Sequence, residues 1–131
     1  MTFELTMLAL SVFLGFIQIV LASHAASLQR GYRWTASARD EALPPLTGVA
    51  GRLARALANF NETFPFFAAV VLAAHLVGVH DWRTHWGAAL YFFARLAYLP
   101  LYAFGVPLIR SLTWNVAVAG IALLLWAMVL P

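Results

Sequence analysis

Residues 112–130 contain no charged side chain, and this run constrains the fold more than any other feature of the sequence. Comparable apolar runs cover residues 3–26 and 86–104, and a longer, partly amphipathic one covers residues 47–78. About 20 apolar residues in a helix cross a hydrocarbon core about 30 Å thick. The sequence therefore predicts an all-α integral membrane protein with a single domain over residues 1–131. Its four transmembrane helices are expected at approximately 3–27, 47–78, 85–104 and 108–130.

The composition of the 131-residue chain agrees with a membrane location. Hydrophobic residues make up 63% and charged residues 10%, against roughly 45–50% and 25% in soluble domains. A soluble monomer of this length could not bury so much apolar surface, and a disordered chain would need many more charges. The lack of cysteine excludes a disulfide framework and a thiolate nucleophile. No histidine spacing typical of a metal site is present, so we expect no metal.

The first apolar run and the polar segment that follows it each need interpretation. The first apolar run could be a cleaved signal peptide, but nothing positive precedes it and Glu4 is acidic, so we expect a retained helix. Residues 27–46 are polar and contain Gly31 and a Pro44-Pro45 pair, which predicts a loop without regular structure. Thr47 follows these prolines and is expected to be the N-cap of the next helix.

The arginines predict the orientation of the chain in the membrane. A basic chain could bind nucleic acid, but these arginines flank apolar runs instead of forming a basic face with interleaved aromatics, so no nucleic-acid partner is expected. Cytoplasmic loops of membrane proteins carry an excess of arginine. We therefore expect the 27–46 loop in the cytoplasm and both termini outside, in a bacterial inner membrane. The arginines on the cytoplasmic side would be Arg30, Arg33, Arg39, Arg52, Arg55 and Arg110.

Polar side chains recur at helical spacing inside three of the apolar segments, and intramembrane ionisable residues are functional candidates by default. Several of them on matching faces indicate a polar cleft between helices. This cleft would suit a small zwitterion with carboxylate and ammonium groups, because arginine pairs with carboxylates in a bidentate manner. The alternative is a structural role. Arg52 and Arg55 would then extend to the lipid headgroups, and Glu62 would neutralise Arg95 or Arg55. The recurring residues are Arg52, Arg55, Asn59 and Glu62, then Arg95, Tyr98 and Tyr102, then Arg110 and Ser111.

Two motifs resemble the MAPEG family, the membrane-associated proteins in eicosanoid and glutathione metabolism. The first is Arg55-Ala-Leu-Ala-Asn-Phe-Asn-Glu62 with the following Phe-Pro-Phe. The second is Arg95-Leu-Ala-Tyr98, then Tyr102, then Pro107-Leu-Ile-Arg-Ser111. The resemblance implies a homotrimer of four-helix subunits that binds glutathione as co-substrate at each subunit interface. It implies that glutathione contacts Arg55, Asn59, Glu62, Arg95, Tyr98, Tyr102 and Arg110.

The resemblance also implies a reaction, namely that of a membrane glutathione transferase or peroxidase. Arg110 would stabilise the thiolate together with the positive end of the last helix, and Ser111 would lie beside the sulfur. A small hydrophobic electrophile would enter from the membrane lipids. The alternative is a non-catalytic trimeric membrane protein whose polar layer is structural or binds lipid headgroups. A small transporter is disfavoured because no inverted repeat or broken helix pair is present.

Overall fold

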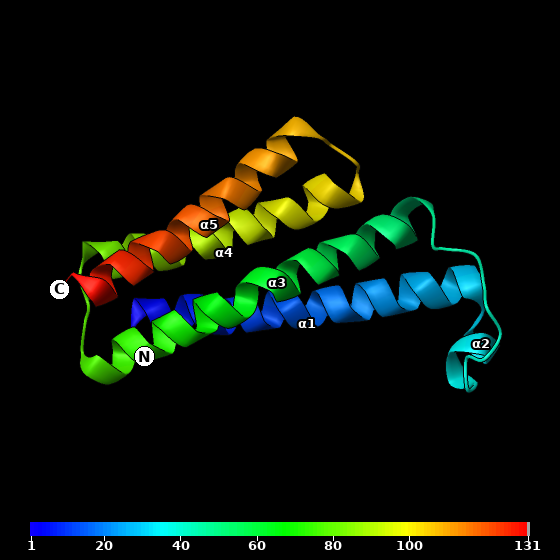
Figure 1. Cartoon of the computed structure of the whole chain (residues 1–131), viewed down its shortest axis with the longest axis horizontal. Helices are drawn as coiled ribbons and strands as arrows, with labels where there is room; N and C mark the ends of the chain where they lie inside the picture. Colours follow the sequence, from blue (N-terminus) through cyan, green and yellow to red (C-terminus); the bar gives the residue numbers. More distant parts are fainter. Residues whose placement is uncertain (131) are drawn as a thin grey trace.

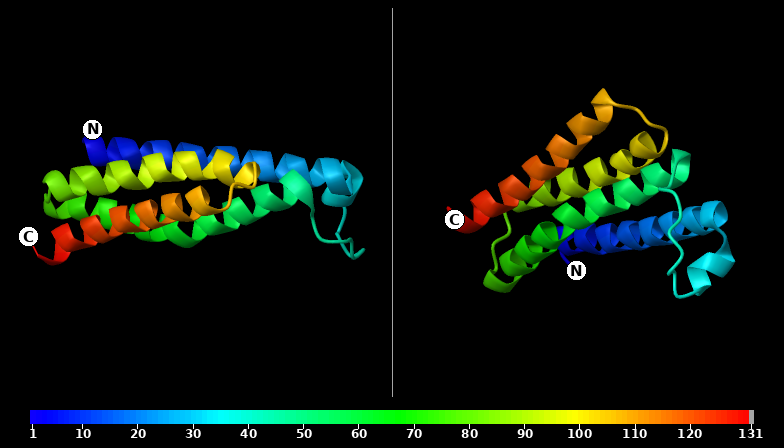
Figure 2. Two further views of the ribbon diagram at one scale, coloured as in Figure 1. Left: turned by 90° about the horizontal axis from the view of Figure 1, so that it is seen from above. Right: turned by 45° about the vertical axis from the view of Figure 1, so that its right-hand side comes forward.

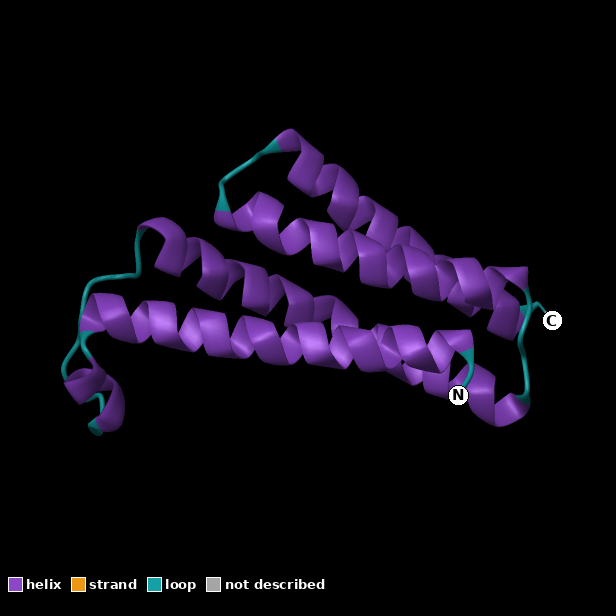
Figure 3. Cartoon of the chain, turned by 180° about the vertical axis from the view of Figure 1, so that it is seen from behind, coloured by secondary structure: helices purple, strands orange, loops and turns teal. Residues whose placement is uncertain are grey.

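The computed structural model describes residues 1–130, and within this range all regular structure is helical (Figures 1 and 3). Four long helices occupy the four predicted segments, with ends within a few residues of those expected. The prediction of four helices is nevertheless wrong by one, because a short fifth helix lies in the predicted loop. The helices are α1 (Phe3–Arg30), α2 (Tyr32–Ala36), α3 (Gly48–Val77), α4 (Trp82–Ala103) and α5 (Leu108–Val129).

The segment 27–46 is more ordered than the sequence predicted. Helix α1 continues to Arg30, and Gly31 then reverses the chain with a φ of 95°, a conformation that favours glycine. The single turn of α2 folds back against α1, where the hydroxyls of Ser27 and Thr35 are 2.9 Å apart and hydrogen-bonded. A five-residue helix is too short to show a hydrophobic period, which is why the sequence did not reveal α2.

Thr47 lies at the predicted N-cap position of α3, but its side chain does not cap the helix. Its hydroxyl instead accepts a hydrogen bond of 2.9 Å from the Gln29 amide, and the Gln29 oxygen accepts one of 3.0 Å from the Thr47 backbone N–H. This reciprocal contact joins the end of α1 to the start of α3. The loop between the two helices is therefore closed at its base.

The long helices form two pairs, α1 with α3 and α4 with α5 (Figure 1). The pairs lie close together at the end where both termini are found and diverge toward the other end, as the views in Figures 1 and 2 agree. Helices α4 and α5 touch backbone to backbone at Gly87 and Gly120. A Cβ built on Gly120 would lie 2.6 Å from the Gly87 carbonyl oxygen, so neither position has room for a side chain.

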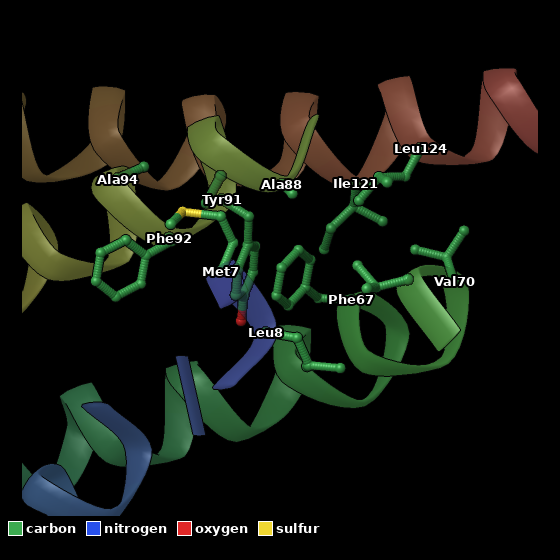
Figure 4. Packing of buried hydrophobic residues seen from close by; sticks show 12 residues of the cluster. Met7, Leu8, Phe67, Val70, Ala88, Tyr91, Phe92, Ala94, Ile121 and Leu124 are labelled. Atoms are coloured by element: carbon green, nitrogen blue, oxygen red, sulfur yellow. The ribbon is translucent and has the colours of Figure 1, made fainter. Parts of the chain in front are cut away.

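A core at the converging end holds the two pairs together (Figure 4). The rings of Phe67 on α3 and Tyr91 on α4 stack with centroids 3.9 Å apart. The Tyr91 hydroxyl is 3.0 Å from that of Thr63, which satisfies both buried polar groups. All four long helices contribute to this core, through Met7, Leu8, Phe67, Val70, Val71, Ala88, Tyr91, Phe92, Ala94, Ala117, Ile121 and Leu124.

Polar contacts fix the same end of the α4–α5 pair. Asp81 is the N-cap of α4, and its carboxylate accepts a hydrogen bond of 2.6 Å from Arg83. The hydrogen bonds from the Arg83 guanidinium hold the pKa of the Asp81 carboxyl below its ordinary value of 3.8. Arg83 also donates to the Leu130 carbonyl at 2.5 Å and lies over the Trp126 ring, 5.2 Å from its centre. The start of α4 therefore caps the end of α5.

Three of the helices, α1, α3 and α5, are long and apolar enough to span a membrane. Helix α4 is not among them; it carries Arg83 near its start and Arg95 further along. Large apolar side chains point away from the bundle; Phe13 and Phe16 on α1 are each 62% exposed. Soluble monomers rarely expose apolar surface over whole helices, whereas such a surface is favourable in contact with lipid.

Candidate functional site

A polar cavity of about 570 Å³ lies between α3, α4 and the start of α5, at the end where the two helix pairs diverge. Most of the predicted site residues line it, although they come from three helices far apart in the sequence. Arg95 does not, because it is buried behind the wall, and Arg52 of the predicted polar face also lies outside. The lining residues are Arg55, Ala58, Asn59, Glu62, Tyr98, Tyr102, Arg110, Ser111, Trp114 and Asn115.

Tyr102 organises the two arginines of the cavity. Its hydroxyl accepts a hydrogen bond of 3.2 Å from Arg55 Nε on α3. The guanidinium of Arg110 on α5 lies 4.6 Å from the centre of the same ring, within the range of a cation–π contact. The Tyr98 ring is 5.4 Å away on the same helix. One aromatic side chain thus positions two positive charges from different helices at one site.

Asn59 presents a hydrogen-bond donor to the cavity, because Arg95 occupies its oxygen. Arg95 is only 1% exposed and donates from Nη1 to Asn59 Oδ1 at 2.7 Å. An arginine has no acceptor, so the amide oxygen must face it. The Asn59 Nδ2 group is then the amide atom left for the cavity. The guanidinium also lies 4.2 Å from the Tyr98 ring centre, while its Nε and Nη2 have no partner in the described chain.

Glu62 is the acidic group of the cavity, and it is exposed and unpaired. Among residues 1–130, the contacts at ion-pair distance join Asp81 to Arg83 and Glu4 to His80, the latter an ion pair only when the histidine is protonated. The structural alternative, in which Glu62 neutralises Arg55 or Arg95, is therefore not realised within one chain. Glu62 lies near the middle of α3, where a charge facing hydrocarbon is costly.

Arg52 departs from the predicted polar face. Its Nε donates to the Ala103 carbonyl oxygen at 2.8 Å and so links α3 to the end of α4. This contact satisfies one of the carbonyl groups that every helix leaves open at its C-terminus. Arg52 therefore holds the rim of the cavity instead of lining it.

The start of α5 supplies backbone donors beside Arg110. Pro107 takes the N-cap position and its side chain offers no acceptor, so the first N–H groups of α5 have no side-chain cap. Trp114 and Asn115 also line the cavity, and the sequence analysis did not identify them as site residues. Their positions, one helical turn beyond Arg110 and Ser111, were a signal that could have found them.

No grouping of three or more metal-binding side chains occurs within residues 1–130. The cavity is instead built from groups that recognise charge: two guanidiniums, an amide donor and one carboxylate. The residues of the two sequence motifs therefore line one cavity: Arg55, Asn59 and Glu62 come from the first motif, and Tyr98, Tyr102, Arg110 and Ser111 come from the second. The sequence model of the MAPEG family matches residues 7–130.

The chain belongs to the MAPEG family. No protein of curated function matches it significantly. Family membership and the three apolar helices together identify an integral membrane protein, and they indicate a function in glutathione or eicosanoid metabolism. The resemblance seen in the two motifs is thereby confirmed over nearly the whole chain.

A second, apolar groove of about 640 Å³ adjoins the polar cavity of this MAPEG protein. It runs between α3 and α5 and is walled by apolar side chains such as Phe66, Val70 and Ile121. Glu62 and Trp114 line both hollows, so the two meet at these residues. The site can therefore accept a charged ligand on one side and an apolar group directly beside it.

Proposed function

We propose that this MAPEG protein is a membrane-embedded glutathione transferase or peroxidase that acts on a small apolar electrophile. The observation that carries the proposal is the polar cavity, which sets two arginines, an amide donor and one free carboxylate around a single space. Glutathione has two carboxylates, one ammonium group and two amides. Arg55 and Asn59 would bind its acceptors, and Glu62 would bind its ammonium group.

Arg110 is the residue proposed to activate the thiol. The glutathione thiol has a pKa well above neutral, so catalysis needs a group that favours the thiolate. A guanidinium close to the sulfur does this, and the open N-terminus of α5 adds partial positive charge. Ser111 would donate a hydrogen bond to the same sulfur. The protein would supply proximity and electrostatics, while glutathione supplies the nucleophile.

The apolar groove supports an electrophile as second substrate. In a transfer reaction the thiolate sulfur forms a bond to an electrophilic carbon, and the leaving group departs with the electron pair. In a peroxidase reaction the thiolate attacks a hydroperoxide oxygen, the O–O bond breaks, and the alkoxide leaves as an alcohol after protonation. A second glutathione thiol then displaces water from the resulting glutathione sulfenic acid and forms the disulfide. Both reactions require the second substrate next to the sulfur, and the apolar groove beside the cavity would hold an apolar one there.

We further propose a homotrimer with the cavity at subunit interfaces and all four long helices crossing the membrane. An exposed Glu62 midway along α3 supports assembly, because a single subunit would turn this charge toward lipid. Both termini lie at the end opposite the 27–46 segment (Figure 1), as an even number of crossings requires. The arginine excess of that segment supports a cytoplasmic location there, in a bacterial inner membrane.

Thiolate absorbance tests the function directly. Glutathione added to the detergent-solubilised protein should raise ultraviolet absorbance in the thiolate band near neutral pH, and R110A should reduce the rise. S-methylglutathione is the matched control, since it should bind and produce no thiolate. If glutathione neither binds nor raises the absorbance, the polar layer has the structural or lipid-binding role and the proposal fails.

A further inference from the structure

The loop end of the bundle carries arginines that the protein itself does not neutralise. Arg30 ends α1, Arg33 lies in α2 and Arg39 follows it. Asp40 and Glu41 come next in the sequence, yet neither carboxylate lies within 4.0 Å of an arginine in the described chain. The positive charge of this segment is therefore available to an anion from outside.

Two of these arginines are fixed around one indole ring. The guanidinium carbons of Arg30 and Arg39 lie 5.2 and 5.6 Å from the centre of the Trp34 ring. Trp34 is itself anchored, because its indole N–H donates to the Glu41 carbonyl at 3.0 Å. Arg39 Nε donates to the Thr35 carbonyl at 3.1 Å. Each arginine keeps further N–H groups that can donate to an anion.

A pocket of about 310 Å³ opens beside Arg30, at the junction of α1 and α3. The reciprocal Gln29–Thr47 contact forms its base, and the Pro44-Pro45 pair forms a stiff wall with Leu43. Arg30 Nη2 donates to the Pro44 carbonyl at 3.4 Å, and Arg30 is the residue that this pocket shares with the Trp34 cluster, since Trp34 and Arg39 do not line it. The pocket thus combines a guanidinium with an apolar wall, which suits an anion attached to an apolar or glycerol-like group.

The position of the pocket decides among possible anions. Helix α1 has 28 residues and is about 42 Å long at 1.5 Å per residue. This exceeds the hydrocarbon thickness of about 30 Å, so the end of α1 reaches the headgroup layer. Tryptophan and arginine side chains at this depth are typical of the membrane interface. The anion present there at high local concentration is the phosphodiester of an acidic lipid.

We propose that Arg30, Arg39 and Trp34 form a binding site for the phosphate of an anionic phospholipid. The two guanidiniums donate to the phosphate oxygens, the indole holds them in place, and the Leu43–Pro45 wall contacts the glycerol region of the lipid. The site is separate from the glutathione cavity and does not depend on the proposed enzyme activity. It would bind the loop end of each subunit to acidic lipid of one leaflet.

Thermal unfolding in detergent micelles tests this site by titration with phosphatidylglycerol. The lipid should raise the unfolding temperature of the parent protein, and phosphatidylcholine should not. Each interfacial arginine contributes about 1 kcal/mol toward an anionic surface, which is about fivefold in affinity. R39Q should therefore raise the half-maximal lipid concentration about fivefold, and the R30Q/R39Q double variant about 30-fold. Arg39 is exposed, so R39Q should fold even if Arg30 proves necessary for the loop.

R33Q is the matched control, because it removes the same charge from the same segment without touching Trp34 in the structure. It should titrate like the parent protein. Equal weakening by R33Q and R39Q would mean that charge acts diffusely and would overturn the site. An equal effect of phosphatidylcholine would overturn the requirement for an anion. If glycerol phosphate stabilised the protein at the same concentration as the lipid, the pocket would bind a free anion and the lipid proposal would fail.

Discussion

Replacing Asn59 by Asp reverses one polar group of the cavity and changes almost nothing in shape. Asn59 Oδ1 accepts from the buried Arg95 at 2.7 Å, and Nδ2 is the donor left for a ligand. In N59D one carboxylate oxygen keeps the contact with Arg95, while the other presents an acceptor to the cavity. The variant therefore exchanges a donor for a negative charge at the position proposed to bind an acceptor of glutathione.

The effects of N59D on stability and on binding should differ. At 2.7 Å, the attraction between Arg95 and a carboxylate is about 6 kcal/mol with an effective dielectric constant of about 20. Burying the carboxylate costs several kcal/mol, so the two terms nearly cancel. Losing a donor to a charged acceptor costs about 1.5–3 kcal/mol, or about 10- to 150-fold in affinity. Repulsion between two carboxylates adds to this loss.

Calorimetric titration with S-methylglutathione measures the binding, and thermal unfolding of the same samples measures the stability. N61D is the matched control, because Asn61 is an exposed neighbour on α3 that does not line the cavity. N59D should bind at least tenfold more weakly while unfolding near the parent temperature. If N59D and N61D bind equally well, the Asn59 amide does not face the ligand and the argument from the Arg95 contact is wrong.

Three further outcomes are expected. R110A should raise the apparent pKa of bound glutathione by about 1–3 units, so that turnover falls at neutral pH and partly recovers at alkaline pH; a pH–rate profile that overlays the parent profile would remove Arg110 from thiolate stabilisation. G120A should destabilise the protein by about 1–3 kcal/mol in chemical denaturation, because its Cβ would lie 2.6 Å from the Gly87 carbonyl; unchanged stability would mean that the helices separate freely. The Asp81 carboxylate stabilises the folded protein above its unfolded pKa of about 3.8, and this stabilisation is lost as pH falls through the lower pKa of the folded state. The parent should therefore lose stability below pH 3.8, and D81N should lack that part of the loss.

The helical period accounts for much of the site. Arg55, Asn59 and Glu62 lie three and four residues apart, and the structure does place them on one wall of the cavity. Arg52 has the same spacing but bonds to the Ala103 carbonyl, since the end of α4 comes beside it. The sequence of α3 contains no information about where the end of α4 lies, so this contact could not be predicted from it. Spacing along one helix predicts a shared face, whereas the partner of that face depends on packing.

Arg95 shows the same limit from within α4. Its spacing to Tyr98 and Tyr102 predicted a common face, yet the side chain is buried behind Asn59. The rotation of α4 is set by its contacts with α3 and α5, which a single helix does not encode. Helix α2 was missed for another reason, because five residues carry no measurable period. The long elements were predictable, and their mutual rotation was not.

The contact between Gly87 and Gly120 has a mechanical consequence for the α4–α5 hairpin. It acts as a fulcrum, and Arg110 lies ten residues along α5, or about 15 Å away at 1.5 Å per residue. A change of about 4° in the angle between the helices at this point would move Arg110 by about 1 Å. Displacements of that size in a catalytic group can cost about a hundredfold in rate. Two residues without side chains thus set the aperture of a site that they never touch.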